Sequence, residues 1–172
     1  MIPNMADLGD DKTVETFLGV ATAGKSVYIR VNGDGVALVC PTLKAFINRM
    51  MRDGRNDFIV DLNRCDYVDS CFMGTLVEVV LEGRGRVVVI NTRPKVRQRF
   101  ELLGLTQILP VKGRGVDVPR VTLHRLRIGG AGKRELARVV ESAHRSLIRA
   151  DDRNRTRFEP LLRTLRKELE DS

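Results

Sequence analysis

The chain has 172 residues, of which 42% are hydrophobic and 30% charged, a balance typical of a globular protein with one core of ordinary size. No run approaches the roughly 18 apolar residues that a membrane-spanning helix needs, and the N-terminal residues lack the basic and then apolar pattern of a signal peptide. These observations exclude a membrane-inserted protein and predict a cytoplasmic one.

Positive charge is concentrated in the C-terminal half of the chain. Residues 1–86 carry 10 Lys and Arg against 12 Asp and Glu, whereas residues 87–172 carry 20 against 10. A basic surface can attract nucleic acid by neutralising its phosphates. Here, however, the basic residues alternate with acidic ones at helical spacing, and the chain has no Trp and only two Tyr to stack on bases. Solvated helix faces therefore explain the charge better than specific nucleic-acid recognition.

The N-terminal part of the chain predicts a β-hairpin followed by an amphipathic helix. Residues 16–22 and 26–32 have the apolar and polar alternation of strands, and the small residues around Gly24 suit the turn between them. After a glycine-rich break, residues 41–53 place apolar side chains on one helical face, and Gly54 ends the pattern.

Strands and helices then alternate through the middle of the chain. The pattern predicts a buried strand over 57–62, a helix that includes 75–81, a buried strand over 86–90, a helix over 93–103, and a closing strand within 105–111. A hairpin followed by this alternation predicts an α/β fold, with a mixed β-sheet covered by α-helices.

The C-terminal region predicts a helical extension. Two apolar stripes at helical spacing indicate two helices that form a hairpin. Neither helix can bury its stripe alone, so the hairpin must dock on the sheet domain, on a second copy of the chain, or on another protein. We divide the chain into a disordered N-terminus (1–12), an α/β domain (13–112), a linker or extra strand (113–131) and the helical hairpin extension (132–172).

One segment matches a nucleotide-binding motif. Residues 19–26 (GVATAGKS) fit the P-loop pattern GxxxxGK[ST], and Asp61 ends a hydrophobic run like the aspartate that holds magnesium in such enzymes. The mechanism requires a helix that begins at Lys25 and Ser26, whereas residues 27–31 alternate as a strand does. A turn of small residues is the better interpretation, and a P-loop nucleotide hydrolase is the less favoured alternative.

The cysteines and histidines form no recognisable catalytic or metal pattern. Cys40, Cys65 and Cys71 are odd in number and contain no CxxC pair, which predicts reduced packing thiols rather than disulfides or a zinc site. His124 and His144 lie near no Ser-Asp or Cys-Asp arrangement in the sequence, so a surface or packing role is the better hypothesis, and a triad assembled by folding is left open. No metal or cofactor is predicted.

The most informative segment is residues 61–74 (DLNRCDYVDSCFMG), between a predicted strand and a predicted helix. Asp69 and Ser70 stand at the expected helix start, where an N-cap side chain stabilises the helix by about 1 kcal/mol, so capping alone could explain these residue types. A strand ending in Asp-Leu, then Asp-Ser-x-x-x-Gly and an aliphatic helix, resembles the anti-sigma-factor antagonist branch of the STAS domain family. Residues 27–35 (VYIRVNGDG) and 92–111 (TRPKVRQRFELLGLTQILPV) resemble the same family, so the resemblance covers the whole predicted α/β domain.

The resemblance implies a STAS-like fold and a non-catalytic protein-binding switch. In that family the serine that matches Ser70 is phosphorylated by a partner kinase that is also an anti-sigma factor, and a phosphatase reverses the modification. The dephosphorylated antagonist binds the anti-sigma factor, and the phosphorylated one is released. The resemblance thus implies phosphorylation at Ser70 and partner binding by Asp69, Ser70, Cys71 and Met73. The alternative is a constitutive STAS scaffold without phosphorylation, and the C-terminal extension lies outside the resemblance.

Overall fold

The computed structural model describes residues 15–171, so the predicted disordered segment 1–12 lies outside the described residues. Within them, six strands form one mixed sheet in the order β5-β4-β3-β2-β1-β6. Strands β2 to β5 run parallel, and β1 is antiparallel to both of its neighbours. The strands are β1 (Phe17–Ala23), β2 (Ser26–Asn32), β3 (Asp57–Arg64), β4 (Arg86–Thr92), β5 (Val111–Gly113) and β6 (His124–Arg127).

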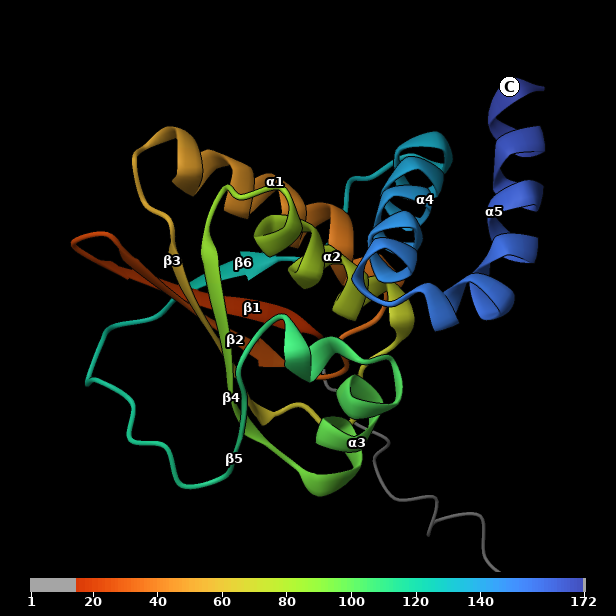
Figure 1. Ribbon diagram of the computed structural model, residues 1–172. Coiled ribbons are helices and arrows are strands. Elements are labelled where there is room, and N and C mark those ends of the chain that lie inside the picture. The colour runs from red at the N-terminus through yellow and green to blue at the C-terminus, as the bar shows by residue number, and fades with distance from the viewer. Residues whose placement is uncertain (1–14, 172) are drawn as a thin grey trace, which may run out of the picture.

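Helices cover one face of this sheet, and a helical hairpin lies at the C-terminal end of the chain (Figure 1). The α-helices are α1 (Cys40–Arg52), α2 (Ser70–Leu81), α3 (Pro94–Leu102), α4 (Lys133–Ala150) and α5 (Arg155–Glu170). Three short 3-10 helices join them, namely η1 (Ala37–Val39), η2 (Leu105–Gln107) and η3 (Asp152–Asn154). The predicted α/β class, with a mixed sheet covered by helices, is confirmed.

The predicted hairpin is present, and it decides the interpretation of the P-loop motif. Strands β1 and β2 pair from Phe17 with Asn32 to Ala23 with Ser26, and Gly24 adopts the left-handed conformation (φ 57°) that the turn requires. Ser26 therefore begins a strand rather than a helix. The segment offers no helix N-terminus to a nucleotide phosphate, so the motif is a turn of small residues, as expected.

The region predicted as a closing strand differs from expectation. Gly104 turns the chain in the left-handed conformation (φ 70°), and η2 follows it. Leu105 and Leu109 are both buried and four residues apart, a helical spacing, and the backbone N–H of Leu109 donates to the carbonyl of Leu105. Only Val111–Gly113 then pairs as strand β5. The predicted strand is therefore wrong for residues 105–110, because the spacing of Leu105 and Leu109 is that of one helical turn.

The undecided segment 113–131 contains a strand. β6 pairs antiparallel with β1, at the edge of the sheet opposite to β5. Residues 114–123 therefore cross the sheet from one edge to the other. Strand β6 joins the same sheet as the preceding strands. The division of the chain at residues 113 and 132 stays a prediction.

The C-terminal helical hairpin, formed by α4 and α5, docks on the α/β core. Helix α4 packs along α2, and α5 packs on α4. The apolar side chains of α4 that join the core are Val139, Ala143 and Leu147, each less than 9% exposed. Of the three docking surfaces considered above, the structure uses the chain's own sheet domain, and α5 lies on the outside (Figure 1).

The opposite face of the sheet holds a buried polar network centred on Asp61, which is 0% exposed. Its carboxylate accepts hydrogen bonds from the Tyr28 hydroxyl, from Arg30 Nε at 3.0 Å, and from the Asn91 amide at 3.2 Å. Asn91 also bonds the backbone of Val116 in the crossing segment. Asn91 has a positive φ of 58°, which asparagine tolerates better than most residues.

These bonds decide the ionisation of the network. Burial alone would raise the pKa of Asp61, but the bonds from Tyr28, the Asn63 backbone, Arg30 and Asn91 outweigh it, so the pKa lies below the ordinary value. Burial, with the hydrogen bond to Asp61, raises the pKa of Tyr28 to about 12. The aspartate that superficially resembled a magnesium ligand is therefore a structural anion held by the fold.

Asp61→Asn should lower the free energy of unfolding at pH 7 by about 1–3 kcal/mol, because Arg30 and Tyr28 lose a buried ionised acceptor. The depressed pKa of Asp61 stabilises the native state above the unfolded pKa of about 4 and ceases to do so as pH falls through the folded pKa. Urea unfolding between pH 7 and pH 3 should therefore show a weaker pH dependence in the variant. Asp53→Asn, at an exposed position at the end of α1, is the control. Equal stability of all three proteins would contradict the assignment.

Candidate functional site

The loop between β3 and α2 presents Asp69 and Ser70 at a helix start. Asp69 is the N-cap residue, and its Oδ1 accepts the backbone N–H of Phe72 at 2.9 Å. Its Oδ2 accepts the backbone N–H of Ala37 at 2.8 Å, which ties the cap to η1. Ser70 is the first residue of α2. The cap predicted for this pair belongs to Asp69, so the Ser70 hydroxyl is left for another partner.

That partner is His144, which α4 brings from 74 residues along the chain. Ser70 Oγ lies 2.8 Å from His144 Nε2, and His144 Nδ1 lies 2.7 Å from the carbonyl oxygen of Val140. A carbonyl can only accept, so Nδ1 carries the proton and Nε2 accepts the Ser70 hydroxyl. The ring of Phe158 from α5 packs edge-on against the imidazole, with centroids 4.9 Å apart.

The imidazole of His144 is neutral in this setting. Its burial lowers the pKa, and this outweighs the bond to Val140 and the charge of Asp69, both of which raise it. A histidine that was expected to be a surface or packing residue is therefore also the hydrogen-bond acceptor of the candidate serine. Its one detectable signal in the sequence is its place beside Ala143 in the apolar stripe of α4.

The close approach of α4 to α2 depends on Gly74. A Cβ atom at this position would collide with the backbone carbonyl of Ala143. A second link joins the same helices, because buried Glu78 accepts from Lys44 of α1 at 3.0 Å and from the hydroxyl of Ser142. The extension is thus connected to the core by packing and by a buried polar cluster.

The predicted partner-binding residues differ in exposure. Asp69 and Ser70 are half-buried, whereas Cys71 and Met73 are each 2% exposed. Cys71 lies beside Cys40, and this neighbouring thiol, together with burial, raises the pKa of Cys40. Burial likewise raises the pKa of Cys65. All three cysteines are free and buried, as packing thiols are, and the assignment of the four partner contacts stays a prediction.

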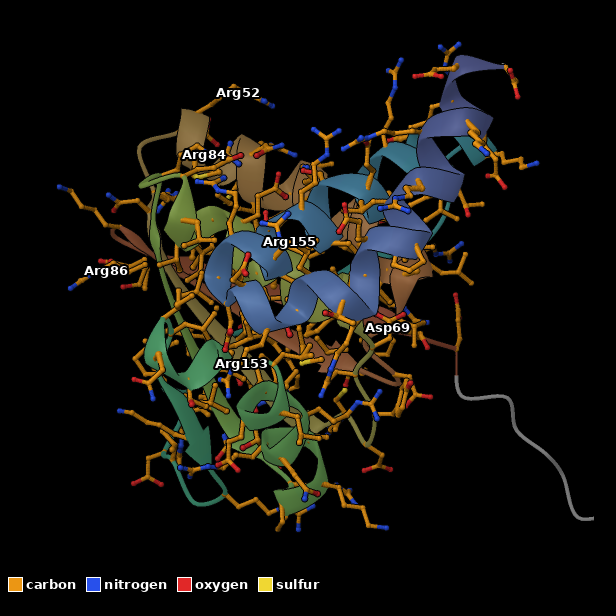
Figure 2. The ribbon with its side chains drawn as sticks, turned by 45° about the vertical axis from the view of Figure 1, so that its right-hand side comes forward. Arg52, Asp69, Arg84, Arg86, Arg153 and Arg155 are labelled. Carbon is orange, nitrogen blue, oxygen red and sulfur yellow. The ribbon has the colours of Figure 1, made fainter. Side chains whose placement is uncertain are left out.

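A cleft of about 320 Å³ opens beside Ser70. Its walls come from the loop before α2, from the start of α2, from α3 and from α5. The residues that line it are Tyr67, Asp69, Ser70, Met73, Arg99, Leu102, Leu103, Arg157 and Phe158. Figure 2 shows Asp69 at the edge of the helical hairpin that borders this cleft. The sequence did not indicate that two arginines from separate helices would meet here.

Other kinds of site are not found in the part of the chain that the structure describes. Among residues 15–171, no group of three or more His, Cys, Asp or Glu side chains is arranged to hold a metal ion. No helix of the same residues is long and apolar enough to cross a membrane.

Comparison with known proteins places this geometry in a family. The family profile described as "Mlab, STAS domain" matches residues 18–110, which is more than half of the chain. The chain belongs to the STAS domain family. Its α/β core is the matched part, and the hairpin of α4 and α5 lies beyond it.

Relatives of this STAS protein include anti-sigma factor antagonists. An anti-sigma-B factor antagonist of Staphylococcus aureus is 26% identical over 94 residues, which cover 52% of this chain and 86% of that protein. A Thermotoga maritima crystal structure, provisionally described as an anti-sigma factor antagonist, has a TM-score of 0.51 at 16% identity and covers 59% of this chain and 87% of its own. The antagonist SpoIIAA in its unphosphorylated form has a TM-score of 0.46 at 20% identity, covering 58% and 89%. The chain is therefore a STAS domain with a helical extension, and its core is similar to these antagonists.

The buried neutral His144 predicts acid sensitivity. Below about pH 6.5 the unfolded chain binds a proton at this imidazole, whereas the folded protein, with its lowered pKa, binds it only at lower pH. The free energy of unfolding should therefore fall as pH decreases from 7.5 to 5.5, by at most about 1.4 kcal/mol per pH unit from this group. Urea unfolding of His144→Gln should show a shallower pH slope than wild type, and His124→Gln, at an exposed position, is the control. An unchanged slope in His144→Gln would contradict the burial of a neutral ring.

Proposed function

We propose that this protein is a non-catalytic switch of the anti-sigma-factor antagonist type, acting in the cytoplasm and controlled by phosphorylation of Ser70. Its partner is an anti-sigma factor that is also a serine kinase, and a phosphatase restores the hydroxyl. The observation that best supports the proposal is the Ser70 hydroxyl, which stands at the start of α2, borders an open cleft and is oriented by neutral His144. The family membership and the antagonist relatives support the same class of function.

The site suits phosphoryl transfer by a partner enzyme. In that reaction a bond forms between Ser70 Oγ and the γ-phosphorus of ATP, the bond from that phosphorus to ADP breaks, and the hydroxyl loses its proton. In the free chain His144 Nε2 of α4 accepts the Ser70 hydrogen bond at 2.8 Å. When the bound partner displaces α4, a base of the kinase takes the proton. The kinase supplies ATP and the catalytic machinery, and this chain supplies the acceptor.

The phosphate changes the charge of the partner surface. It adds about −1.5 to −2 charges at pH 7 beside the Asp69 carboxylate. Asp66, the next acidic residue, is paired with Arg93 and adds less to the repulsion. A partner that is shaped for a neutral hydroxyl at Ser70 therefore loses affinity for the phosphorylated form.

Partner binding also requires movement of the helical hairpin. The proposed contact residues are Asp69, Ser70, Cys71 and Met73, but the last two are each only 2% exposed, and the neighbouring Gly74 lies against Ala143 of α4. A partner that contacts the whole start of α2 must displace α4. Binding of the partner and docking of the hairpin therefore compete for the same face. Self-association through the displaced or outer faces of these helices, where Leu161 is 37% exposed, stays a prediction.

A constitutive STAS scaffold is the second candidate. One observation favours it: the Ser70 hydroxyl already has a hydrogen-bond partner within the chain, which a purely structural serine would also have. On this alternative the hairpin is a permanent part of the core, and charge at Ser70 has no effect on partner affinity.

Ser70→Ala should retain binding to the kinase-type partner, whereas Ser70→Asp should weaken it by about 1–3 kcal/mol, because a charge is then buried against a surface made for a hydroxyl. The partner is obtained by affinity purification with the wild-type chain and titrated calorimetrically against each variant. Ser26→Asp, at the start of β2 in the β-hairpin formed by β1 and β2, is the matched control for an added charge.

Stability separates the two candidates further. Because Asp69 caps α2, Ser70→Ala loses only the bond to His144 and should cost about 0.5–1.5 kcal/mol in a melting experiment. Equal partner affinities for wild type, Ser70→Ala and Ser70→Asp would reject the phosphorylation switch in favour of the scaffold.

A further inference from the structure

The cleft beside Ser70 contains two arginines that no acidic residue of the cleft neutralises. Arg99 comes from α3 and Arg157 from α5, and both line the cleft together with Ser70. The one carboxylate in the lining, Asp69, is already bound by the backbone N–H groups of Phe72 and Ala37. The cleft is therefore positively charged at the end of the Ser70 side chain.

The guanidinium of Arg99 is fixed by Tyr67, and one of its N–H groups has no hydrogen-bond acceptor within residues 15–171. Its Nη2 donates to the Tyr67 hydroxyl at 3.0 Å, and its guanidinium lies over the Tyr67 ring, 4.4 Å from the centroid. Its Nε is buried and has no hydrogen-bond partner among the described residues. A buried donor without an acceptor is unfavourable, so a small movement of this side chain toward an anion in the cleft would relieve it. The fixed, planar guanidinium is the group that binds phosphate oxygens best.

Arg157 differs from its neighbours on the hairpin. Arg153 is paired with Asp151 and Arg155 with Asp152, both near the start of α5 (Figure 2). Arg157 forms no ion pair with a carboxylate of residues 15–171, and it lines the cleft instead. Since α5 carries it, any anion bound between Arg157 and Arg99 would join α5 to α3 across the start of α2.

We propose that this cleft is an intramolecular binding site for the phosphate group of phosphorylated Ser70, with Arg99 and Arg157 as its ligands. The inference rests on the proposed function, since it takes Ser70 to be the phosphorylated residue. The phosphate needs no long reach, because Ser70 itself forms part of the wall. The groups that face it are Asp69 on α2, Tyr67 in the preceding loop, Arg99 on α3, His144 on α4 and Arg157 on α5.

This site gives phosphorylation a second effect on the partner. Phosphate bound by Arg99 and Arg157 ties α5 to the core and holds the hairpin against the start of α2. The hydroxyl form has only the Ser70–His144 bond at this point, so its hairpin is displaced more readily. Release of the partner then follows from closure of the hairpin as well as from charge repulsion.

The test uses the full-length protein with phosphoserine incorporated at position 70 during translation, so that neither kinase nor partner is needed. The second ionisation of the phosphate is followed by ³¹P NMR as a function of pH. A free phosphoserine has this pKa at about 6, and two adjacent guanidinium groups should lower it by about one unit or more. Arg157→Gln should return the value at least halfway to that of the free group. Arg155→Gln, an exposed position on the same helix, should leave it unchanged.

A phosphate pKa near 6 that Arg157→Gln does not change would overturn the proposal. A second result would also overturn it: inorganic phosphate binds saturably to the unphosphorylated chain, Arg157→Gln abolishes this binding, and the phosphate pKa of phosphoserine 70 is not shifted. The cleft would then bind a free anion instead. Hydrogen exchange of α5 provides a second readout, and it should slow on phosphorylation in wild type but not in Arg157→Gln. The two tests are independent. An unshifted phosphoserine pKa would reject the phosphate site without affecting the partner titration of Ser70→Asp, and equal partner affinities would reject the proposed switch without affecting the pKa measurement.

Discussion

The contact between α2 and α4 at Gly74 sets the geometry of the whole candidate site. Gly74 lies one helical turn after Ser70 on α2, and its lack of a side chain lets the carbonyl of Ala143 approach the helix backbone. The next residue of α4, His144, then reaches the Ser70 hydroxyl. The position of α5, which packs on α4, and the cleft that α5 borders both follow from this approach.

The energetics of the hairpin favour a closed but displaceable arrangement. The Ser70–His144 bond contributes only about 0.5–1.5 kcal/mol, whereas burial of the apolar side chains of α4 provides the main stabilisation. A partner that replaces those contacts with its own can therefore displace the hairpin, because the polar bond alone is weak. A phosphate on Ser70 would add charged bonds to this mainly apolar contact, so that one residue could alter the balance between the docked and the displaced hairpin.

Much of the fold could be predicted from the sequence because local patterns determine it. The alternation of residues 26–32 produces β2, the small residues at Gly24 produce the turn, and the Asp69 cap begins α2. The sequence does not determine strand β6, because a strand of only four residues at the sheet edge has little periodicity. The site is different. The pairing of Ser70 with His144 depends on which of three surfaces the hairpin uses, and the meeting of Arg99 with Arg157 depends on the same choice.

The most direct test of this account measures whether the contact at Gly74 holds the hairpin on α2, with buried Cys71 in the first turn of that helix as the reporter. Alkylation of the individual cysteines is followed by mass spectrometry in wild type, in Gly74→Ala, and in Gly113→Ala, where a Cβ meets nothing within 4 Å. Cys65, in the loop after β3, reports global unfolding in each protein. The account predicts that Gly74→Ala raises the alkylation rate of Cys71 about tenfold or more, while Cys65 and the Gly113→Ala protein keep their wild-type rates. Unchanged alkylation of Cys71 in Gly74→Ala would contradict the claim that this contact holds the hairpin of α4 and α5 on α2.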